Sequence, residues 1–596
     1  MDLDSYFEKL VRPRTASRLS FLEAILRTFT PGERFILYAF TVLLGTSAVA
    51  LIIGLNTSVS VSVPTYGGTL VEGEIGSARF INPVLTLSQP DEDLSALVYS
   101  GLTRMRPDGT VAPDLASQYT ISPDGTTYTF KIRTNAIFHD KKPVTASDVI
   151  FTVEAVQNPE IKSPHRSDWE GVEVSSPDPY TVVFKLPHAY TPFIENTTLG
   201  ILPKHMWDNV SSEEFPFSLG NTRPIGSGPY RVTRTDTDAT GTAIRYDLAP
   251  FSKYALGKPF LKRITFMFYP NQAAMAAAFD AGEIDAMAGI APQELAKISR
   301  DDIRVAHVAL PRIFGVFFNQ SHAPVLADSS VRGALLASVD KTEIIRRVLS
   351  EYAVPLEGAI PPGVNGTMEP AVPLAHVANM STSTDISIDA SRADRARAIL
   401  ARGGWKFDEA AGIWKKKKLE LSFSLATADE PELVATANAL AKYWRAAGIK
   451  VAIQIYPLSE LNTNVIRPRA YDAILFGEVV GRTADLFAFW HSSQRNDPGL
   501  NLAMYANSKV DTVLAQARAT TDSKQREKLY TQFNTEIEKD VPAIFLYAPE
   551  FIYIVPNAVQ GIKLGALSTP SERFLNVHEW YTDTERVWSI FTNAIN

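Results

Sequence analysis

Hydrophobic and polar residues follow two periodicities along this chain, and together they predict a mixture of strands and helices. Alternating apolar positions predict half-buried strands at 127–133, 181–186 and 264–269. Helical apolar spacing, with a capping residue at one end, predicts helices at 272–282, 328–340 and 432–448. A further strand pattern, 450–456, follows the last helix directly. The mixture predicts an α/β fold whose units do not alternate strictly.

The longest apolar run, Phe35–Leu55, has 21 residues and no charge. At about 1.5 Å per residue, a helix of this length crosses the ~30 Å core of a bilayer. Six basic residues precede the run, and residues 56–70 contain no Lys or Arg. The positive-inside rule therefore predicts that 1–34 is a cytoplasmic basic segment and that the chain after 56 is extracytoplasmic.

A cleaved signal peptide is the alternative interpretation of this N-terminal region. The apolar run is longer than the usual signal core of about 7–15 residues, and it begins far from Met1. Both features favour a retained, single-pass anchor at 35–55 in the cell membrane. The segment 56–68 is uncharged and rich in small residues, so it is expected to be a linker.

Composition and charge narrow the classes of function. A chain of 596 residues predicts two or three domains. Its net charge of −7 argues against a dedicated nucleic-acid binder, which usually has a basic excess. The absence of cysteine excludes disulfides, a cysteine nucleophile, thiolate metal sites and a lipid-modified N-terminal cysteine.

Motifs for catalysis, metal binding and cofactor binding are missing from the sequence. It contains no HExxH, P-loop or GxSxG motif, and its nine histidines are scattered. The segment GSGPY, 226–230, lacks the Lys and Ser/Thr of a P-loop, so a tight turn before a strand is expected there. Adjacent His139 and Asp140 are interpreted as a surface turn. The sequence therefore predicts no enzyme, no cofactor and no metal site.

Seven segments, taken in order, resemble the family 5 extracytoplasmic solute-binding proteins of ABC importers, the oligopeptide, dipeptide and nickel-binding group. The resemblance covers about Tyr66–Tyr581. The segments are GGTLVEGEIGSARFINPVL (67–85), the block from 98 to 154, PIGSGPYRV (224–232), FDAGEIDAM (279–287), 317–345, 444–453 and 509–547.

The resemblance implies a two-lobed fold of the periplasmic-binding-protein type (type II, cluster C) with a hinge. Lobe I would comprise 66–310 plus 530–596, including an extra subdomain at 86–178, and lobe II would comprise 311–529. It also implies a monomer that captures a small, oligopeptide-like ligand in the cleft between its lobes and delivers it to an ABC permease. A ligand sensor that is not coupled to transport, or a binder of a non-peptide solute, remains the alternative.

The same resemblance implies that the strand within 471–481 lines the ligand cleft. Its backbone would pair with an extended peptide, and Gly477 would allow close approach. Peptide-binding members usually carry Trp-x-x-Asp here, with the Asp accepting the ligand's α-ammonium, whereas this chain has Glu478 and Gly481. Two interpretations remain open: Glu478 binds a ligand cation, or it pairs internally with Arg482 or Arg467.

Other ligand-binding candidates follow from the resemblance alone. His165 stands where peptide binders often have a tyrosine. The remaining candidates are Leu87 and Gln89 after the Asn-Pro motif, Phe318 and Asn319 near the hinge, Val479, Val480 and Arg482 on the cleft strand, and Trp490 and His491 after it. A packed aromatic ring or a turn residue is the structural alternative for each of them.

Overall fold

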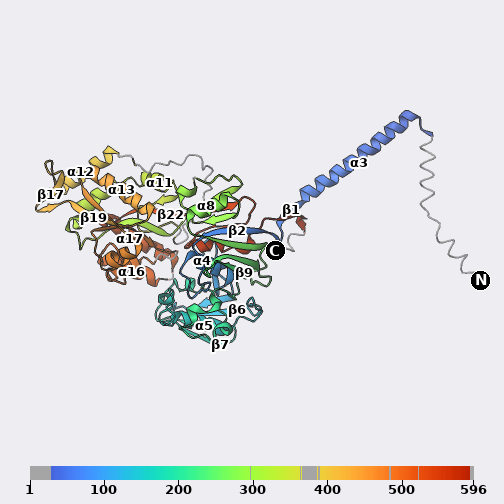
Figure 1. Ribbon diagram of the computed structural model, residues 1–596, viewed down its shortest axis with the longest axis horizontal. Coiled ribbons are helices and arrows are strands. Elements are labelled where there is room, and N and C mark those ends of the chain that lie inside the picture. Colours follow the sequence, from blue (N-terminus) through green and yellow to red (C-terminus); the bar gives the residue numbers. More distant parts are fainter. Residues whose placement is uncertain are drawn as a thin grey trace, which may run out of the picture. The chain divides into compact units, whose positions relative to one another are not determined.

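The computed structural model describes residues 28–590, apart from 296, 363, 365–385, 387–388, 482–484 and 521 (Figure 1). Most of the expected cytoplasmic segment, and Arg482, therefore lie outside the described residues. The chain divides into two compact units. The helix unit comprises 1–65 and 583–596, and the main unit comprises Tyr66–Thr582.

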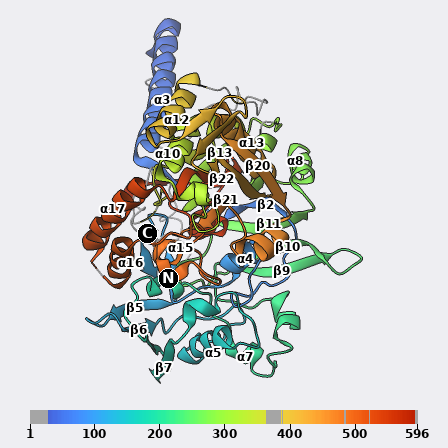
Figure 2. The same ribbon diagram turned by 90° about the vertical axis from the view of Figure 1, so that its left-hand side faces the viewer.

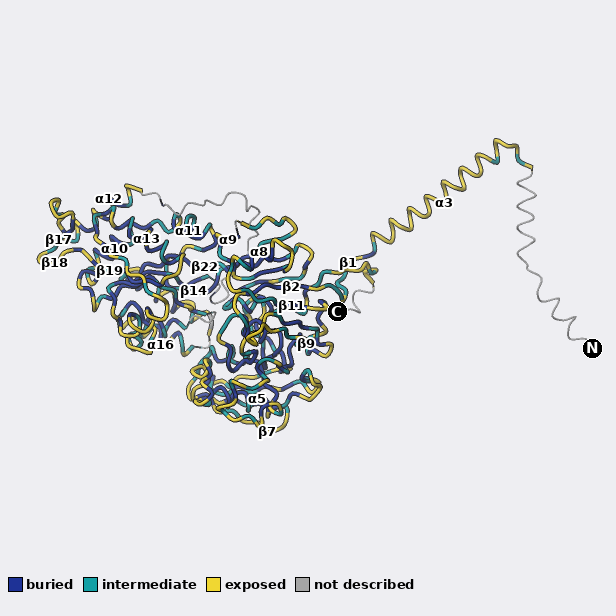
Figure 3. The backbone as a smooth tube through the Cα atoms, in the orientation of Figure 1, coloured by how far each residue is buried: buried dark blue, intermediate teal, exposed yellow. Residues whose placement is uncertain are grey.

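The helix unit contains α3, Pro31–Val59, a single uninterrupted helix with no buried residue (Figures 1 and 3). Thr30 and Glu33 form a capping box at its start, and Pro31 occupies the first turn, where a missing amide proton costs nothing. It is one helix among the described residues that is long and apolar enough to cross a membrane.

The segment 56–68, expected to be a linker, is mostly regular structure. The helix continues to Val59, and β1 (Ser60–Pro64) pairs antiparallel with β23 (Thr584–Trp588). The resemblance had placed β23 in lobe I. The pairing joins segments more than 500 residues apart, so no local pattern could reveal it.

One sheet of 12 strands runs through the main unit (Figure 2). Its order is β20 (Lys450–Tyr456), β19 (Ser422–Ala428), β21 (Ala473–Val479), β14 (Arg312–Phe318), β22 (Ala543–Pro556), β12 (Ala286–Ala288), β2 (Gly67–Ile75), β11 (Leu261–Tyr269), β10 (Ala243–Pro250) and β9 (Tyr230–Thr237). Two more strands, β13 (Ile303–Ala309) and β15 (Ala353–Pro355), also pair with β22. The 14-residue strand β22 is thus shared by both halves of the sheet.

Two large hydrophobic cores define the lobes. The core of lobe I is formed by residues from 70–310 and 551–580, and that of lobe II by residues from 313–548. The first boundary between the two cores falls between Leu310 and Ile313. The second falls between Ala548 and Phe551 rather than at 529, because the first half of β22 packs in lobe II.

Helices pack around the strands of both lobes. Those of lobe II are α10 (Ser329–Ser338), α11 (Lys341–Val348), α12 (Ala390–Arg402), α13 (Pro431–Ala446), α14 (Leu458–Glu460), α15 (Phe487–Trp490), α16 (Ser508–Ala519) and α17 (Ser523–Asp540). Those of lobe I are α4 (Gln89–Val98), α5 (Ala146–Gln157), α6 (Phe193–Asn196), α7 (Lys204–Trp207), α8 (Gln272–Asp280) and α9 (Pro292–Leu295). The helix and strand predictions at 272–282, 432–448 and 450–456 are confirmed by α8, α13 and β20.

Smaller sheets lie outside the central one. Lobe I contains a four-stranded sheet in the order β5 (Ala116–Ile121), β6 (Thr127–Ile132), β8 (Thr181–Lys185) and β7 (Glu173–Asp178), and a pair formed by β3 (Thr103–Met105) and β4 (Val111–Pro113). Lobe II contains a three-stranded sheet of β16 (Lys406–Asp408), β17 (Ile413–Lys416) and β18 (Leu419–Glu420). The strand predictions at 127–133 and 181–186 are confirmed by β6 and β8.

Candidate functional site

The chain crosses between the two lobes at two places that lie side by side. One crossing is Leu310–Pro311, between β13 and β14, and the other is Pro549–Glu550, within β22. The amide of Leu310 donates to the carbonyl of Pro549 at 3.0 Å. Next to them, His307 Nδ1 and Glu550 Oε2 are 2.7 Å apart. Two adjacent, hydrogen-bonded crossings have the arrangement of a hinge.

A cavity of about 800 Å³ lies at this hinge. Lobe I contributes the ends of β2 and β12 and the segment through α9, while lobe II contributes the first turn of α13. The wall at the hinge includes Phe314 and Phe551. Ligands of open α/β sheets bind beyond the carboxyl ends of the strands. Here the carboxyl ends of β2, β12 and β19 lie at or next to the cavity.

Acidic side chains outnumber basic ones in the lining of this cavity. Among the described residues the carboxylates are Glu74, Glu294, Glu430, Glu432 and Glu550, and the single basic side chain is Arg312. Burial, and secondarily the charge of Glu430, raises the pKa of Glu432 above its usual value. Burial lowers the pKa of Arg312, although Glu92 opposes the shift. The lining is therefore acidic in composition, and its negative charge grows as the pH rises through the raised pKa of Glu432.

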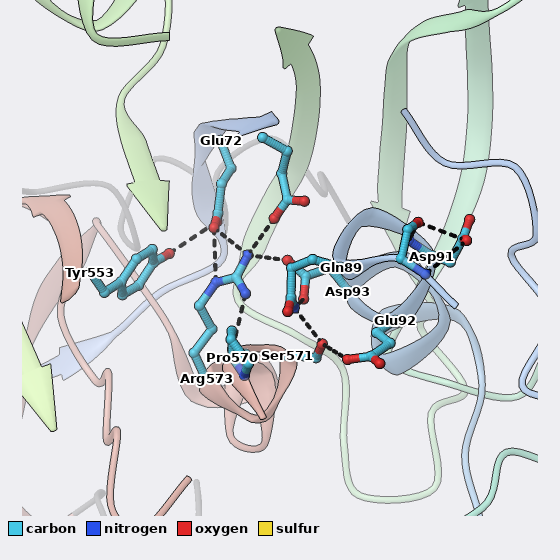
Figure 4. A network of polar contacts seen from close by, with 11 residues as sticks. Glu72, Gln89, Asp91, Glu92, Asp93, Tyr553, Pro570, Ser571 and Arg573 are labelled. Carbon is cyan, nitrogen blue, oxygen red and sulfur yellow. Dashed lines mark hydrogen bonds and ion pairs between the residues drawn. The ribbon is translucent and has the colours of Figure 1, made fainter. Parts of the chain in front are cut away.

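A buried ion network supports the lobe I wall, and Figure 4 shows Arg573 at its centre. The guanidinium donates to Glu72 Oε1 at 2.6 Å, to Glu74 Oε1 at 2.9 Å and to Asp93. All four side chains are at least 96% buried. Burial, and then repulsion by Asp93, raises the pKa of Glu74 well above its usual value. One arginine thus holds three carboxyl groups, one of which lines the cavity.

Glu478, on β21, is a buried acid. It is 4% exposed near the end of β21, and neither carboxylate oxygen has a hydrogen-bond partner among the described residues. Burial raises the pKa of Glu478 well above its usual value, although the charge of Arg469 opposes the shift. Arg469 itself donates to the backbone carbonyls of Arg495, Ile466 and Gly499. Of the two expected internal partners, Arg467 forms no described ion pair with Glu478, and Arg482 lies outside the described residues.

The other residues of this strand end have distinct surroundings. A Cβ at Gly477 would lie 2.7 Å from the ring of Phe314, so the glycine accommodates an aromatic ring of the neighbouring strand. Val479 is exposed and Val480 is buried. The amides of Val480 and Gly481 both donate to the carbonyl of Pro311, at 3.0 and 3.3 Å, and thereby tie the strand end to the hinge.

Two of the candidates from lobe I line cavities. Gln89 lines the hinge cavity, and its amide nitrogen donates to Asp93 Oδ1 at 2.6 Å and to Ser571 Oγ at 2.7 Å. His165 lines a second cavity of about 330 Å³, with its Nε2 3.4 Å from Thr86 Oγ1. Leu87, 71% exposed, projects into solvent.

Four further candidates lie in lobe II. Phe318 and Asn319 are buried, and Asn319 binds the carbonyl of Arg469 and the amides of the turn that follows it. Trp490 is fully buried and packs on Phe545. His491 stacks on Phe487, with ring centroids 4.0 Å apart. The surroundings of Phe318, Asn319 and Trp490 are those of core residues.

The family model for bacterial extracellular solute-binding proteins, family 5, matches residues 110–499. The chain belongs to this family. It is similar to the oligopeptide-binding protein AppA of Bacillus subtilis, with 28% identity over 88% of this chain and 93% of that protein. It is also similar to the dipeptide-binding protein of Escherichia coli, with 25% identity over 86% and 95% of the two chains.

Solved structures of similar proteins have the same fold as this chain. The structure of Bacillus subtilis AppA in complex with a nonapeptide is 26% identical and covers 87% of this chain and all of that one, with a TM-score of 0.65. The structure of NikZ from Campylobacter jejuni in complex with Ni(L-His) is 26% identical, covers 86% and 99% of the two chains and has a TM-score of 0.66. The two-lobed solute-binding fold is therefore confirmed, and this family 5 protein has its cavity at the hinge between the lobes.

The sequence predictions missed the acidic wall of this solute-binding protein. Glu430 lies two residues after the end of β19, Glu432 lies in the first turn of α13, and Glu74 is the last residue but one of β2. Charged residues at the carboxyl ends of predicted strands are a usable signal for a ligand site in an α/β protein. No strand was predicted from periodicity at β2, so the signal could not be applied there.

Proposed function

We propose that this protein is a monomeric, membrane-anchored receptor that captures a positively charged, peptide-like solute between its lobes and delivers it to an ABC permease. The observation that carries the proposal is the cavity of about 800 Å³ at the hinge, whose walls come from both lobes. A solute bound there contacts both lobes at once, so it stabilises the closed arrangement over an open one.

The charge of the lining supports a cationic solute. Five carboxyl side chains and one guanidinium line the cavity among the described residues. A positively charged group compensates carboxylates that have lost part of their hydration, whereas an anionic group would be repelled. The solute therefore carries an ammonium or guanidinium group that lies near Glu430 and Glu432.

The names of the relatives support a peptide-like solute. AppA is described as oligopeptide-binding and was solved with a nonapeptide, and the Escherichia coli relative is described as dipeptide-binding. Glu478 and Gly481 replace the Trp and Asp expected in peptide binders, which favours a cationic non-peptide solute as the second candidate. In both cases the chain binds a solute and does not transform it.

The membrane anchor is supported by α3. This helix has no buried residue, contains the 21-residue uncharged run and follows a basic segment. The anchor would keep the main unit outside the cytoplasm and near the permease. Full-length protein that remains in the membrane after alkaline carbonate washing supports this part of the proposal, and protein released into the medium contradicts it.

Native mass spectrometry of the full-length protein, released from detergent micelles and purified without stripping ligands, tests the solute. A set of co-purifying short peptides rich in lysine or arginine is the expected result. A single cationic non-peptide species would replace the peptide assignment with the second candidate. An anionic species would contradict the charge argument for either solute.

A further inference from the structure

The last described segment of the chain belongs to the helix unit rather than to a lobe. β23 pairs with β1 over five residues, from Ser60 opposite Trp588 to Pro64 opposite Thr584. The amide of Thr65 donates to the carbonyl of Asp583 at 3.0 Å and extends the pairing by one step. We call these two strands the juxtamembrane ribbon. It begins at Ser60, the residue that follows the end of α3.

Two side chains of β23 reach back to the last turns of α3. The indole Nε1 of Trp588 donates to Asn56 Oδ1 at 2.7 Å, and a guanidinium nitrogen of Arg586 donates to the carbonyl of Thr57 at 3.2 Å. Asn56 is the residue directly after Leu55, where the uncharged apolar run ends. The indole is thereby held at the level where α3 would leave a bilayer.

The ring of Trp588 is in an unusual state for a large aromatic side chain. Its polar N–H is satisfied, yet 49% of the residue is exposed. The other seven tryptophans are all buried in the main unit. Val61, on β1, and Ile590, two residues after Trp588, are also exposed. A tryptophan with a bonded N–H and an open apolar ring is the residue type enriched at membrane–water interfaces.

We propose that the juxtamembrane ribbon is a second membrane contact, with Trp588 inserted into the headgroup region of the outer leaflet. The proposal rests on the anchor of the proposed function, because α3 must span the bilayer for its end to mark the interface. The molecule that contacts the exposed ring is lipid. The ribbon follows α3 without an intervening residue. If α3 spans a bilayer, the ring of Trp588 therefore lies next to the headgroups.

The ribbon gives the C-terminal strand a role. The chain passes between the helix unit and the main unit twice, at Thr65–Tyr66 and at Thr582–Asp583. Both passages leave from the same ribbon, so the main unit is fastened to the membrane-proximal structure by two strands rather than by one flexible tether.

Fluorescence quenching by brominated lipid tests the contact. The full-length protein is reconstituted into vesicles of phosphatidylcholine with either brominated or ordinary acyl chains. Quenching by the brominated chains is expected in the wild type and is expected to be mostly lost in Trp588→Phe. Because the other tryptophans are buried in the main unit, the difference between the two proteins reports on one ring.

Matched controls separate this proposal from the anchor itself. Asn56→Leu removes the acceptor of the indole N–H. It is expected to change the extent of fluorescence quenching without releasing the protein from the membrane. If the wild type and Trp588→Phe both resist carbonate washing and their fluorescence is quenched equally, the ribbon proposal is wrong and the anchor stands. If carbonate releases the protein, both fail. If Trp588 is quenched by brominated lipid no more than in water, and becomes protected from solvent only when a permease is added, the lipid contact is also wrong.

Discussion

At the scale of single residues, Glu478 shows how a buried carboxyl group reports on its surroundings. No described residue offers it a hydrogen bond, and its charged form has lost its hydration. Both conditions disfavour ionisation, so its surroundings hold the side chain as a neutral acid at pH values where exposed glutamates are charged. A neutral acid can donate a hydrogen bond, whereas an ionised one attracts a cation, and the two roles differ in their pH dependence.

Glu478→Gln tests which form the folded protein contains. The raised pKa in the folded state means that this residue favours folding at low pH and that the contribution is lost as the pH rises through the raised value. The variant is expected to match the wild type near pH 5 and to become the more stable of the two at pH 8 in urea unfolding. Glu460→Gln, at an exposed site, is the matched control and is expected to show no such difference. Parallel pH profiles for Glu478→Gln and the wild type would argue for an ionised, compensated Glu478.

Asp114 offers a second test with a defined pH window. It is 4% exposed in the lining of the smaller cavity, and burial raises its pKa to about 7, although Arg104 opposes the shift. A raised folded-state pKa means that stability is lost as the pH rises from about 4 to 7. Asp114→Asn is expected to gain roughly 2–3 kcal/mol relative to the wild type between pH 5 and pH 8 in urea unfolding. A difference that does not change with pH would show that Asp114 ionises normally.

At the scale of elements, the pairing of β14 with β21 depends on the absence of a side chain at Gly477. The Phe314 ring lies over this glycine and stacks on Tyr547, with centroids 5.4 Å apart. Gly477→Ala is expected to cost about 1–3 kcal/mol because the ring must move within a packed layer. Gly333→Ala is the control, since a Cβ there meets Ile399 at 3.8 Å within α10 and should be neutral or stabilising. An equal effect of both substitutions on the unfolding midpoint would contradict this account.

Arg573 joins three elements of lobe I, because it lies between β2, α4 and β22. Arg573→Met leaves Glu72 and Asp93 buried without their cation, and a loss of about 3–5 kcal/mol is expected. The loss should shrink at low pH, since protonation removes the uncompensated charges. Arg234→Met, at a largely exposed pair with Asp236, is expected to cost under about 1 kcal/mol. If calorimetry finds similar melting temperatures for both variants, the network does not stabilise lobe I.

Local patterns predicted some elements well and left others undetermined. β20 has the predicted bounds, because its apolar alternation and the glycine before it are both local signals. The predicted lobe boundary at 529 differs from the change of core near 549. Residues of β22 are apolar in both halves, so its sequence does not show which residues pack in which core. The pairing of β1 with β23 has no local signal at all.

The site was predicted unevenly for the same reason. The family resemblance named Gln89, which lines the hinge cavity, and the strand within 471–481, none of whose described residues lines it. Periodicity could not show that Phe314 occupies the space above Gly477. Asn319 and Trp490 resemble pocket residues in sequence, and only packing shows that they lie in the core of lobe II. Burial and cross-strand neighbours are properties of the folded chain.

At the scale of the whole molecule, the hinge cavity connects charge to solute capture. Its walls come from both lobes, so a bound cation contacts carboxylates of lobe II and the wall of lobe I together. The closed form needs only a few kcal/mol of preferential binding to become dominant. A charge change on one wall should therefore alter affinity without altering the fold.

Glu432→Gln tests this coupling. The probes are two tripeptides of equal length, Ala-Lys-Ala and Ala-Gln-Ala, titrated calorimetrically into the full-length protein in detergent. Loss of one carboxylate is expected to weaken binding of the lysine peptide by about tenfold, corresponding to about 1.4 kcal/mol. The effect on the glutamine peptide should be much smaller.

The pH dependence sharpens the same test. Because burial raises the pKa of Glu432, its charge develops only as the pH rises above the usual range for a glutamate. Wild-type affinity for the lysine peptide should therefore increase with pH through that range, and Glu432→Gln should lose part of this increase. Glu420→Gln, at an exposed site on β18, is the control and should keep the wild-type profile. Tighter binding of the lysine peptide by Glu432→Gln would show that the acidic wall does not select for cations, because a carboxylate that attracts the solute cannot be removed with a gain in affinity.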